Sequence, residues 1–522
     1  MIAAARRLAR QCVTALAFAA SSALAQNREF DLQTASIADI QSAVAAGSLT
    51  YAQLVRLYLN RIEAYDKRGP RLNAIIQVNQ RAIAIADSLD AERRTKGLRS
   101  PLHGIPVAIK DNIDVRDLPS AGGNLALGGS YPARDAAVIA RLRAAGAIIF
   151  VKTNMDELAL GSQGLSSLGG QILNPFDLQR SPGGSSGGSA VAVAVAFATV
   201  AVSTETGLSI RGPAANTATV GIAPTQGLVS RAGVIPISFT QDRVGVHAKS
   251  VRDAATLLAY ISGFDPEDLV TADAFGKVSS TAFSDFATGD LVGARIGVLR
   301  DLFRHGDEFV PGNRLVENAI DRMRTGRAII EDGLTTGIDL VALMPDLRVN
   351  NYELRFAFDA YLRRRGSESP VKSLAELIAT GKYLRTLDRR YELVMSVAGL
   401  DTNSEYLGRL ERQRTIRQAL IDLMDRKQVD ALVYPVKSLP APPIGTADSG
   451  PRDNPVSAVT GLPAIVMPAG FGVDGLPIAI EFLGRPFREA KLIQLAYAYE
   501  RSLPRRSVPP TAPRLPGEVI RY

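Results

Sequence analysis

The chain alternates between amphipathic stretches with helical periodicity and short apolar runs. Residues 35–98 carry apolar side chains three and four positions apart behind Ser36, a favourable helix N-cap, and this spacing predicts helices throughout the stretch. From residue 101 onward, the pattern predicts short buried strands separated by helices. The predicted strands span residues 105–109, 147–151, 199–203, 431–434, 464–467 and 478–482, and the predicted helices span 135–145, 189–197 and 490–503. Such alternation is typical of an α/β sheet whose faces are covered by helices.

The region of residues 316–427 differs from its surroundings because it is mostly helical and more charged. The chain has no internal repeat, low-complexity tract or linker that marks a domain boundary. We therefore expect one α/β domain over residues 26–522. Its core is predicted to be a mixed, mostly parallel twisted β-sheet covered by helices on both faces, with residues 316–427 as a helical cover or insertion.

Residues 1–25 do not fit this fold. Arg6, Arg7 and Arg10 precede an apolar stretch over residues 13–20, and the segment ends in Ala-Leu-Ala. A basic start, an apolar centre and a small-residue cleavage pattern predict a secretory signal peptide, and hence export to the periplasm or the medium. A membrane anchor is the alternative, but the apolar stretch is too short to span a bilayer. The arginine pair leaves the Sec and twin-arginine routes both open.

Charge and rare residues narrow the function. The formal net charge of +8 becomes +5 once the three leader arginines are removed, and the remaining excess is scattered except at residues 363–365 and 389–390. We therefore expect no nucleic-acid partner. Three histidines (His103, His247 and His305) are too few for a multi-histidine zinc site, and the only cysteine, Cys12, lies in the leader. We expect no metal and no cofactor.

A serine-rich segment and one lysine carry the chemistry. Ser185 lies at the centre of the turn Pro182-Gly-Gly-Ser-Ser-Gly, a second turn carries Ser209, and Lys110 ends the predicted strand 105–109. A serine hydroxyl needs a base to become a nucleophile, and a lysine serves only when burial keeps it neutral. Two serines and a lysine are sufficient for acyl transfer on an amide.

Other interpretations of these residues are open. Residues 183–187 match the G-x-S-x-G nucleophile elbow, for which Asp242 with His247, or Asp301 with His305, are the formal partners. The elbow is disfavoured because a loop, not an apolar strand, precedes it. A plain Gly/Ser connector is the simplest alternative, and a P-loop is excluded because no G-K-[ST] follows.

Three further features have simpler explanations. Asp156 and Glu157 resemble first-turn acids at a helix start, since sequence neighbours do not face each other on a helix. Lys152 ends a predicted strand as Lys110 does, and is the rival base. His103 precedes the strand of Lys110, where we expect a structural role.

Three tracts, residues 101–114, 182–190 and 204–214, together resemble the amidase signature family. The resemblance extends to residues 227–242, 351–362, 460–465 and 475–487, and is most marked with exported bacterial peptide amidases. It therefore covers nearly the whole of residues 26–522, as one amidase signature domain.

The resemblance implies a role for each residue that matches the motif. Ser209 matches the nucleophile, Ser185 the bridging serine whose preceding peptide bond is cis, and Lys110 the general base. The backbone amides of Thr206, Gly207 and Leu208, together with that of Ser209, match the oxyanion hole.

The chain departs from the family pattern at three places. Leu208 stands where glycine is usual, and because leucine resists positive φ, we expect a differently shaped oxyanion loop. Glu205 stands where aspartate is common. Residues 245–250, Gly-Val-His-Ala-Lys-Ser, replace Gly-Pro-Met-Ala-Arg-Ser.

The resemblance implies a hydrolase that cleaves a carboxamide C–N bond through a Ser-Ser-Lys relay and an acyl-enzyme. The expected substrates are peptide C-terminal amides or small aliphatic or aryl amides. Two alternatives are an inactive or weakly active amide-binding protein, which Leu208 suggests, and an amidotransferase A-type subunit, which the leader argues against. We expect no stable membrane insertion, and the acyl group, the amine and the oligomeric state stay open.

Overall fold

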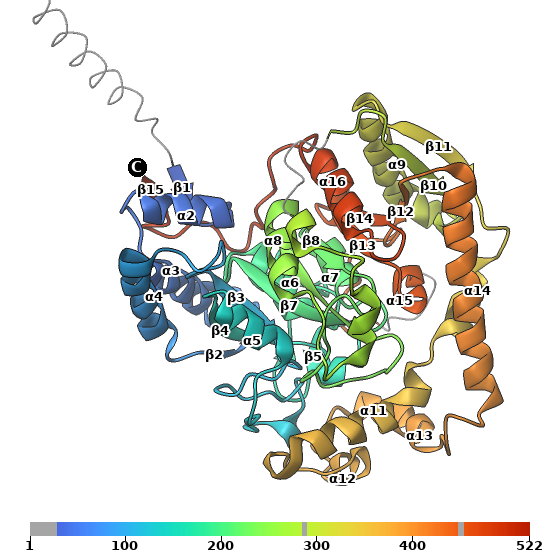
Figure 1. Cartoon of the computed structure of the whole chain (residues 1–522), viewed down its shortest axis with the longest axis horizontal. Helices are drawn as coiled ribbons and strands as arrows, with labels where there is room; N and C mark the ends of the chain where they lie inside the picture. Colours follow the sequence, from blue (N-terminus) through green and yellow to red (C-terminus); the bar gives the residue numbers. More distant parts are fainter. Residues whose placement is uncertain (1–28, 284–289, 447–453) are drawn as a thin grey trace, which may run out of the picture.

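The computed structural model describes residues 29–283, 290–446 and 454–522 (Figure 1). The predicted signal peptide over residues 1–25 lies outside the described residues and stays a prediction. Within the described part of the chain, no helix has both the length and the apolar character needed to cross a bilayer.

An eleven-stranded mixed sheet forms the centre of the fold, in the order β11-β10-β12-β14-β13-β8-β9-β7-β3-β4-β2. Its strands are β2 (Ile75–Val78), β3 (Pro106–Lys110), β4 (Ile148–Thr153), β7 (Val200–Glu205), β8 (Val220–Ala223), β9 (Arg243–Ala248), β10 (Arg295–Leu299), β11 (Ile329–Leu334), β12 (Ala431–Pro435), β13 (Ala464–Phe471) and β14 (Pro477–Leu483). Two small two-stranded sheets pair β1 (Glu29–Asp31) with β15 (Val519–Arg521), and β5 (Leu165–Ser166) with β6 (Gly170–Gln171).

The predicted mixed sheet with helices on both faces is confirmed, but the expectation that it is mostly parallel is wrong. Only four of the ten strand pairs in the large sheet are parallel, and six are antiparallel. Among the predicted strands, β3 pairs in parallel with β4 and β7, whereas β14 pairs antiparallel with both β12 and β13. Strands β8 and β9 were not predicted and add further antiparallel pairs. An apolar run does not reveal its direction, because strand direction depends on how the connecting chain returns.

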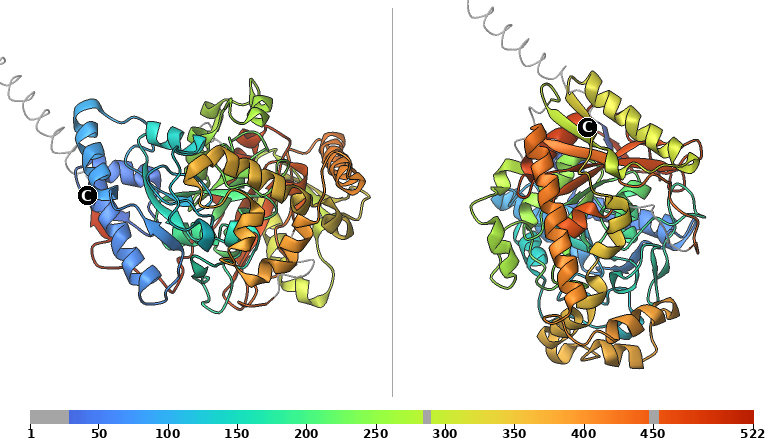
Figure 2. Two further views of the ribbon diagram at one scale, coloured as in Figure 1. Left: turned by 90° about the horizontal axis from the view of Figure 1, so that it is seen from below. Right: turned by 90° about the vertical axis from the view of Figure 1, so that its right-hand side faces the viewer.

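The helices pack against both faces of the sheet (Figures 1 and 2). They are α2 (Ile37–Ala45), α3 (Tyr51–Arg61), α4 (Ala82–Lys96), α5 (Ala137–Ala144), α6 (Gly187–Ala194), α7 (Arg211–Asn216), α8 (Val251–Ile261), α9 (Val310–Thr325), α10 (Leu340–Leu343), α11 (Asn350–Arg365), α12 (Leu374–Ala379), α13 (Asp388–Met395), α14 (Ser404–Lys427), α15 (Val456–Thr460) and α16 (Glu489–Glu500).

Two helix starts show how local sequence positions these elements. Ser36 caps α2 and accepts a hydrogen bond from the amide of Asp39, whose carboxylate binds the Ser36 amide in return. Thr50 and Gln53 form the same capping box at α3. Such reciprocal caps satisfy amide donors that a helix leaves open at its first turn. The predicted cap at Ser36 is therefore confirmed.

Two predicted helical regions contain strands. Within residues 35–98, β2 (Ile75–Val78) pairs antiparallel with β4, and within residues 316–427, β11 extends the sheet beside β10. Both strands lie at the ends of the sheet and are only partly buried. An edge strand with few buried positions leaves no clear alternation in the sequence, so pairing with a distant strand decides its structure.

The helices α11, α12 and α13 lie together at one corner of the molecule, and the long helix α14 runs back from there along one side (Figure 1; Figure 2, right). Residues from α11, α13 and α14 and from the loop after β7 line one common cavity. The predicted helical cover therefore lies over the end of the central strands.

Candidate active site

Lys110 is a fully buried side chain at the carboxyl end of β3. Its Nζ donates to Ser185 Oγ at 2.7 Å, and to the Oγ1 and carbonyl oxygen of Thr204 at 2.9 and 3.1 Å. Strands β3 and β7 run parallel, so both carry their carboxyl ends to the same edge of the sheet. The parallel pairing is what brings Lys110 to Thr204 and to the loop that follows it.

The environment of Lys110 favours the neutral amine. Burial lowers its pKa to about 7, while the negative charges of Asp156, Asp242 and Glu205 act in the opposite direction. Desolvation penalises a charged ammonium more than a neutral amine, which explains the direction of the shift. A base with a pKa near neutrality takes up a proton and releases it again at neutral pH.

Ser185 lies in the loop that precedes α6, and the Gly184–Ser185 peptide bond is cis, as the resemblance implies. The Ser185 carbonyl accepts from the Asp156 amide at 3.2 Å. A Cβ on Gly184 would lie 1.7 Å from Asp156 Oδ2, and this carboxylate is held by the Gly164 amide at 2.8 Å. The loop therefore has no room for a side chain at position 184.

Ser209 lies in the loop between β7 and α7 and is 9% exposed, at the wall of the cavity. The Ser186 amide donates to the Ser209 carbonyl at 3.2 Å, which ties the two serine loops together. In the described residues, no hydrogen bond joins the hydroxyls of Ser185 and Ser209. The structure thus joins Lys110 to Ser185 by a side-chain hydrogen bond, and joins the two serine loops through the backbone.

Four successive amides, those of residues 206–209, line the same cavity. The carbonyl of Thr206 accepts from Gln241 Nε2 at 3.0 Å, and the carbonyl of Gly207 accepts from Arg211 Nη2 at 2.7 Å. Within the described part of the chain, the four amides donate no hydrogen bond. Free backbone amides beside a nucleophile are the donors that stabilise a developing oxyanion.

Leu208 lies in the loop between β7 and α7, one residue before Ser209. Its backbone does not adopt the left-handed conformation, so the leucine side chain causes no steric penalty there. The side chain lies over Gly212, at a place where a Cβ on Gly212 would lie 3.2 Å from Leu208 Cδ2. Leucine therefore fits this backbone, and the expectation of an oxyanion loop shaped differently from that of the family stays a prediction.

A buried ion network anchors the loop that carries Ser209. Glu205 accepts from the amides of Ile210 and Arg211, and it also pairs with the guanidinium of Arg211 at 2.9 Å and with that of Arg243. Arg211 extends the network to Glu481 at 2.8 Å. Burial acts to raise the pKa of Glu205, but Arg211 and Arg243 overcome it and lower the pKa to about 2. The carboxylate therefore holds both ends of the turn.

Lys152, the rival base, does not reach the serines. Its Nζ donates to the Ile113 carbonyl at 2.6 Å and to Ser120 Oγ at 2.7 Å, and it lies 3.7 Å from Asp111. Burial lowers its pKa to about 8. Its contacts lie within the loop after β3, where it is a structural cation.

The carboxylates of Asp156 and Glu157 accept hydrogen bonds from different groups. Asp156 accepts from the amides of Gln163 and Gly164, whereas Glu157 accepts from Asn124 Nδ2 and the Ser167 amide. They begin only the three-residue 3-10 turn Glu157–Ala159. They therefore lie at a helix start, as predicted, although this helix is a single turn, and the pair does not act on a common group.

The histidines do not form a serine–histidine–acid arrangement. His247 bonds to Ser203 Oγ and to the Ile210 carbonyl at 2.9 Å each, and burial lowers its pKa to about 4. Asp242 accepts from Thr206 Oγ1 and backbone amides, and Asp301 accepts from Thr335 and Thr336. The nucleophile-elbow interpretation is therefore wrong, because Ser185 contacts a lysine and neither acid contacts its histidine.

His103 and His247 both have structural contacts. His103 Nε2 bonds to the Leu89 carbonyl at 3.0 Å, which confirms the predicted structural role. His247, by contrast, supports the residue after Ser209, a role that sequence reasoning missed. The replacement of Met by His in residues 245–250 was the only signal that pointed to it.

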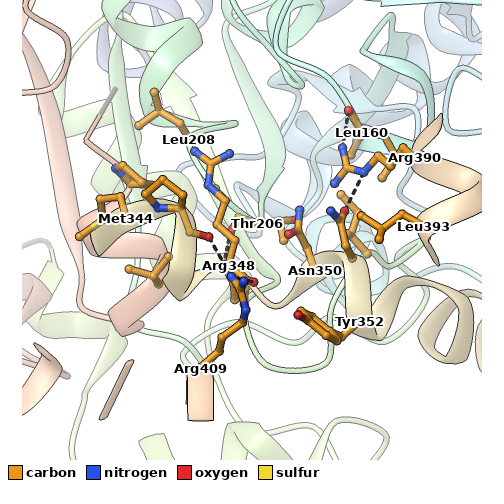
Figure 3. A pocket seen from close by; sticks show the side chains of 18 of the residues that line it. Leu160, Thr206, Leu208, Met344, Arg348, Asn350, Tyr352, Arg390, Leu393 and Arg409 are labelled. Carbon is orange, nitrogen blue, oxygen red and sulfur yellow. Dashed lines mark hydrogen bonds between the residues drawn. The ribbon is translucent and has the colours of Figure 1, made fainter. Parts of the chain in front are cut away.

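A cavity of about 1250 Å³ opens in front of Ser209 (Figure 3). Thr206 and Leu208 of the β7–α7 loop line it together with residues of the helical cover, among them Arg348 and Arg390. Other parts of the wall come from residues 159–162 and from Ile237, Gln241, Pro455 and Val459. Sequence reasoning did not find its arginines, which are Arg304, Arg348, Arg390 and Arg409. The Arg389 and Arg390 pair was visible as a small basic cluster, but nothing in the sequence indicated that it faces a cavity.

Comparisons with known proteins show the family to which the sequence and the overall fold are similar. The family model for amidases matches residues 53–493. A probable amidase from Arabidopsis thaliana is 35% identical and covers 91% of each chain, and the A-type subunit of the glutamyl-tRNA(Gln) amidotransferase from Chloroflexus aggregans is 34% identical over 90% of this chain and 97% of its own. The native peptide amidase of Stenotrophomonas maltophilia superposes with a TM-score of 0.83 at 37% identity, covering 91% of this chain and 98% of its own.

The fold and the family match define a single-domain α/β hydrolase of amides. The chain belongs to the amidase family, as the resemblance in its sequence predicts.

Proposed function

We propose that this protein hydrolyses carboxamides by a Ser209–Ser185–Lys110 relay. Ser209 Oγ attacks the amide carbonyl, its proton passes to Ser185, and the proton of Ser185 passes to Lys110. The amides of Thr206, Gly207, Leu208 and Ser209 bind the oxyanion. The C–N bond then breaks, the relay returns a proton to the leaving nitrogen, and water hydrolyses the acyl-enzyme in the same manner.

One observation carries this proposal: the buried Nζ of Lys110 contacts Ser185 Oγ at 2.7 Å. A lysine in that position accepts a proton only if it is neutral, and its burial favours the neutral form. The relay requires Ser185 Oγ to turn toward Ser209 during the reaction. Rotation of a serine side chain about χ1 moves its Oγ, and hydrogen bonds at active sites often shorten only once substrate is bound.

We infer that the substrates are primary carboxamides with an acyl group larger than a single amino acid. The cavity of about 1250 Å³ exceeds the usual range for a small ligand, which supports an extended acyl group. The likeness to the Stenotrophomonas peptide amidase supports peptide C-terminal amides as the first candidates. Export, proposed from residues 1–25, is checked by sequencing the N-terminus of the protein recovered from the periplasm.

A second candidate function is that of an amidotransferase A-type subunit, which passes ammonia to a partner. The similarity to the Chloroflexus amidotransferase favours it. The two functions are separated by assaying the isolated protein, because only a hydrolase turns over peptide amides without a partner or tRNA.

The replacement Ser209→Ala tests the proposal. We expect kcat on a peptide C-terminal amide to fall by about a thousandfold or more, because the attacking atom is removed. A fluorophosphonate probe should label the wild-type protein on the peptide that contains Ser209, and should leave the variant unlabelled.

Ser502→Ala is the matched control, since it removes a hydroxyl that binds only the Tyr499 carbonyl, away from the cavity. The same ammonia release from wild type and Ser209→Ala would refute the proposal. Binding of the amide without turnover by the wild type would instead support the inactive amide-binding alternative.

A further inference from the structure

The cavity in front of Ser209 is rich in positive charge. Among the described residues that line it, the charged side chains are four arginines and one glutamate, Glu405. Like charges that share a partly enclosed space repel one another unless an anion lies among them. The net charge that the cavity wall presents to a ligand therefore depends on which of these arginines already has an acidic partner.

Arg409 is already paired. Its Nη2 lies 2.8 Å from Glu405 and 3.6 Å from Asp346, and its Nη1 donates to the Pro345 carbonyl at 2.9 Å. The only acidic side chain in the described cavity wall is therefore engaged, and it does not balance the other arginines.

Arg390 (on α13) binds only neutral groups. Its Nη1 donates to the Leu160 carbonyl at 2.7 Å and its Nε donates to Asn351 Oδ1 at 3.0 Å (Figure 3). These two bonds fix the guanidinium at the cavity wall, and no acidic side chain in the described part of the chain pairs with it. Burial and the nearby positive charge of Arg348 lower the pKa of Arg390 to about 10. The group is a preorganised cation without a counter-ion.

Arg348 follows the turn Met344–Leu347 and is exposed to the cavity. Its side chain extends across the cavity toward Leu208, the neighbour of the nucleophile (Figure 3). Its guanidinium has no hydrogen-bond or ion-pair partner among the described residues. Arg348 therefore brings a second unbalanced cation between Arg390 and the oxyanion loop.

We propose that this enzyme prefers amides whose acyl part carries a carboxylate, and that Arg348 and Arg390 bind that carboxylate. The inference rests on the amidase function proposed above. A primary amide releases only ammonia, so every other group of the substrate, including the anion, belongs to the acyl part. The guanidinium fork matches the two oxygens of a carboxylate, and Arg390 spends little conformational entropy because its position is already fixed.

Matched peptide amides test this specificity. Three N-acetyl dipeptide amides differ only in one side chain, placed at the C-terminal residue or one residue before it. The first carries glutamate at that position, the second carries the γ-methyl ester of glutamate, and the third carries lysine. We expect kcat/KM to be at least about tenfold higher for glutamate than for the ester, mostly through a lower KM, and lowest for lysine. The preference should decrease as ionic strength rises.

Three single variants test whether Arg348 and Arg390 cause the preference for the glutamate peptide over its ester. Arg348→Gln and Arg390→Gln should each reduce the ratio of kcat/KM for glutamate over ester toward one. Arg389→Gln is the matched control, because it removes the same charge from the same helix at an exposed position that does not line the cavity. The Arg348 side chain is exposed and has no hydrogen-bond or ion-pair partner among the described residues, so its replacement leaves the fold intact even if Arg390→Gln fails to fold.

The outcomes separate this inference from the proposed function. Equal kcat/KM for the glutamate peptide and its ester, or an unchanged ratio in Arg348→Gln, would overturn the inference and leave the amidase proposal standing. If no peptide amide is hydrolysed, the amidase proposal fails. Calorimetry with Ser209→Ala then still decides the inference, since the glutamate peptide must bind more tightly than its ester.

Discussion

Lys110 and Lys152 show how strongly the function of one residue depends on its neighbours. Lys110 is the last residue of β3 and Lys152 the last but one of the neighbouring parallel strand β4, and both are fully buried. Lys110 meets a serine hydroxyl of a glycine-rich loop, whereas Lys152 meets a backbone carbonyl and Ser120. The same side chain is therefore a candidate base in one place and a structural cation in the other.

The lowered pKa of Lys110 predicts the pH dependence of the reaction. Its pKa falls from 10.5 to about 7, so the amine is mostly neutral above pH 7 and mostly protonated below it. Only the neutral form accepts the serine proton. We expect kcat to decrease by about tenfold per pH unit below about 7 and to level off above it, as measured with a neutral peptide amide.

Lys110→Arg is the companion variant, because it keeps the positive charge and cannot deprotonate in this range. It should be inactive throughout the pH range. A wild-type rate that stays constant down to pH 4 would contradict a lysine base.

At the scale of elements, the sheet determines where the site forms. The parallel pairing of β3 with β7 brings Lys110 and the loop that carries Ser209 to one edge, and α6 follows the loop that carries Ser185. The antiparallel strands β9 and β14 contribute Arg243 and Glu481, which complete the ion network beneath the loop that carries Ser209. Strands far apart in the chain thus stabilise the short turn between β7 and α7, which carries Ser209.

Glu205→Gln tests the contribution of this network to stability. The variant leaves Arg211 and Arg243 buried without their shared carboxylate, so we expect the free energy of unfolding to decrease by about 3–5 kcal/mol. Because the folded pKa of Glu205 is depressed to about 2, its stabilisation is present above pH 4.5 and is lost as the pH falls from there toward 2. Chemical denaturation at several pH values measures both effects.

The exposed pair of Arg295 with Glu331 is the comparison for this experiment, since its side chains are about one-third exposed. Glu331→Gln should cost less than about 1 kcal/mol. An equal, small loss in both variants would show that the buried network does not stabilise the loop.

At the scale of the whole molecule, the two ends of the described chain meet. Strand β1 pairs with β15, the Leu32 amide donates to the Glu518 carbonyl, and Arg61 on α3 forms a fully buried ion pair with Glu518 at 2.8 Å. The C-terminal residues, with Glu518 and β15, therefore bind β1 and helix α3 near the start of the described chain.

Glu518→Gln tests whether these contacts stabilise the entire domain. It leaves the guanidinium of Arg61 buried without its carboxylate, and we expect a loss of about 3 kcal/mol or more, seen as a lower Tm of one cooperative transition. Glu29→Gln, in an exposed pair with Arg521 on the same small sheet, should change the free energy of unfolding by less than about 1 kcal/mol. An early separate transition in Glu518→Gln would instead indicate that the chain ends unfold on their own.

The central strands and the serine–lysine motifs were predictable because their information is local. A short apolar run bounded by Gly104 and Asp111 indicates a buried strand, and a Gly/Ser turn restricts which backbone shapes are available. The edge strands β2 and β11 were not predictable, since they bury few side chains and gain their structure from pairing with a distant strand.

The sequence by itself determined the family, the central strands and the residue types that can perform amide chemistry. Only the tertiary structure decided which of two buried lysines contacts Ser185, how Leu208 fits beside Ser209, and which arginines face the cavity without an acidic partner among the described residues. The reason is that reactivity depends on burial and on charges within a few ångströms, and these neighbours come from segments tens to hundreds of residues apart. Residue spacing along the chain does not encode them.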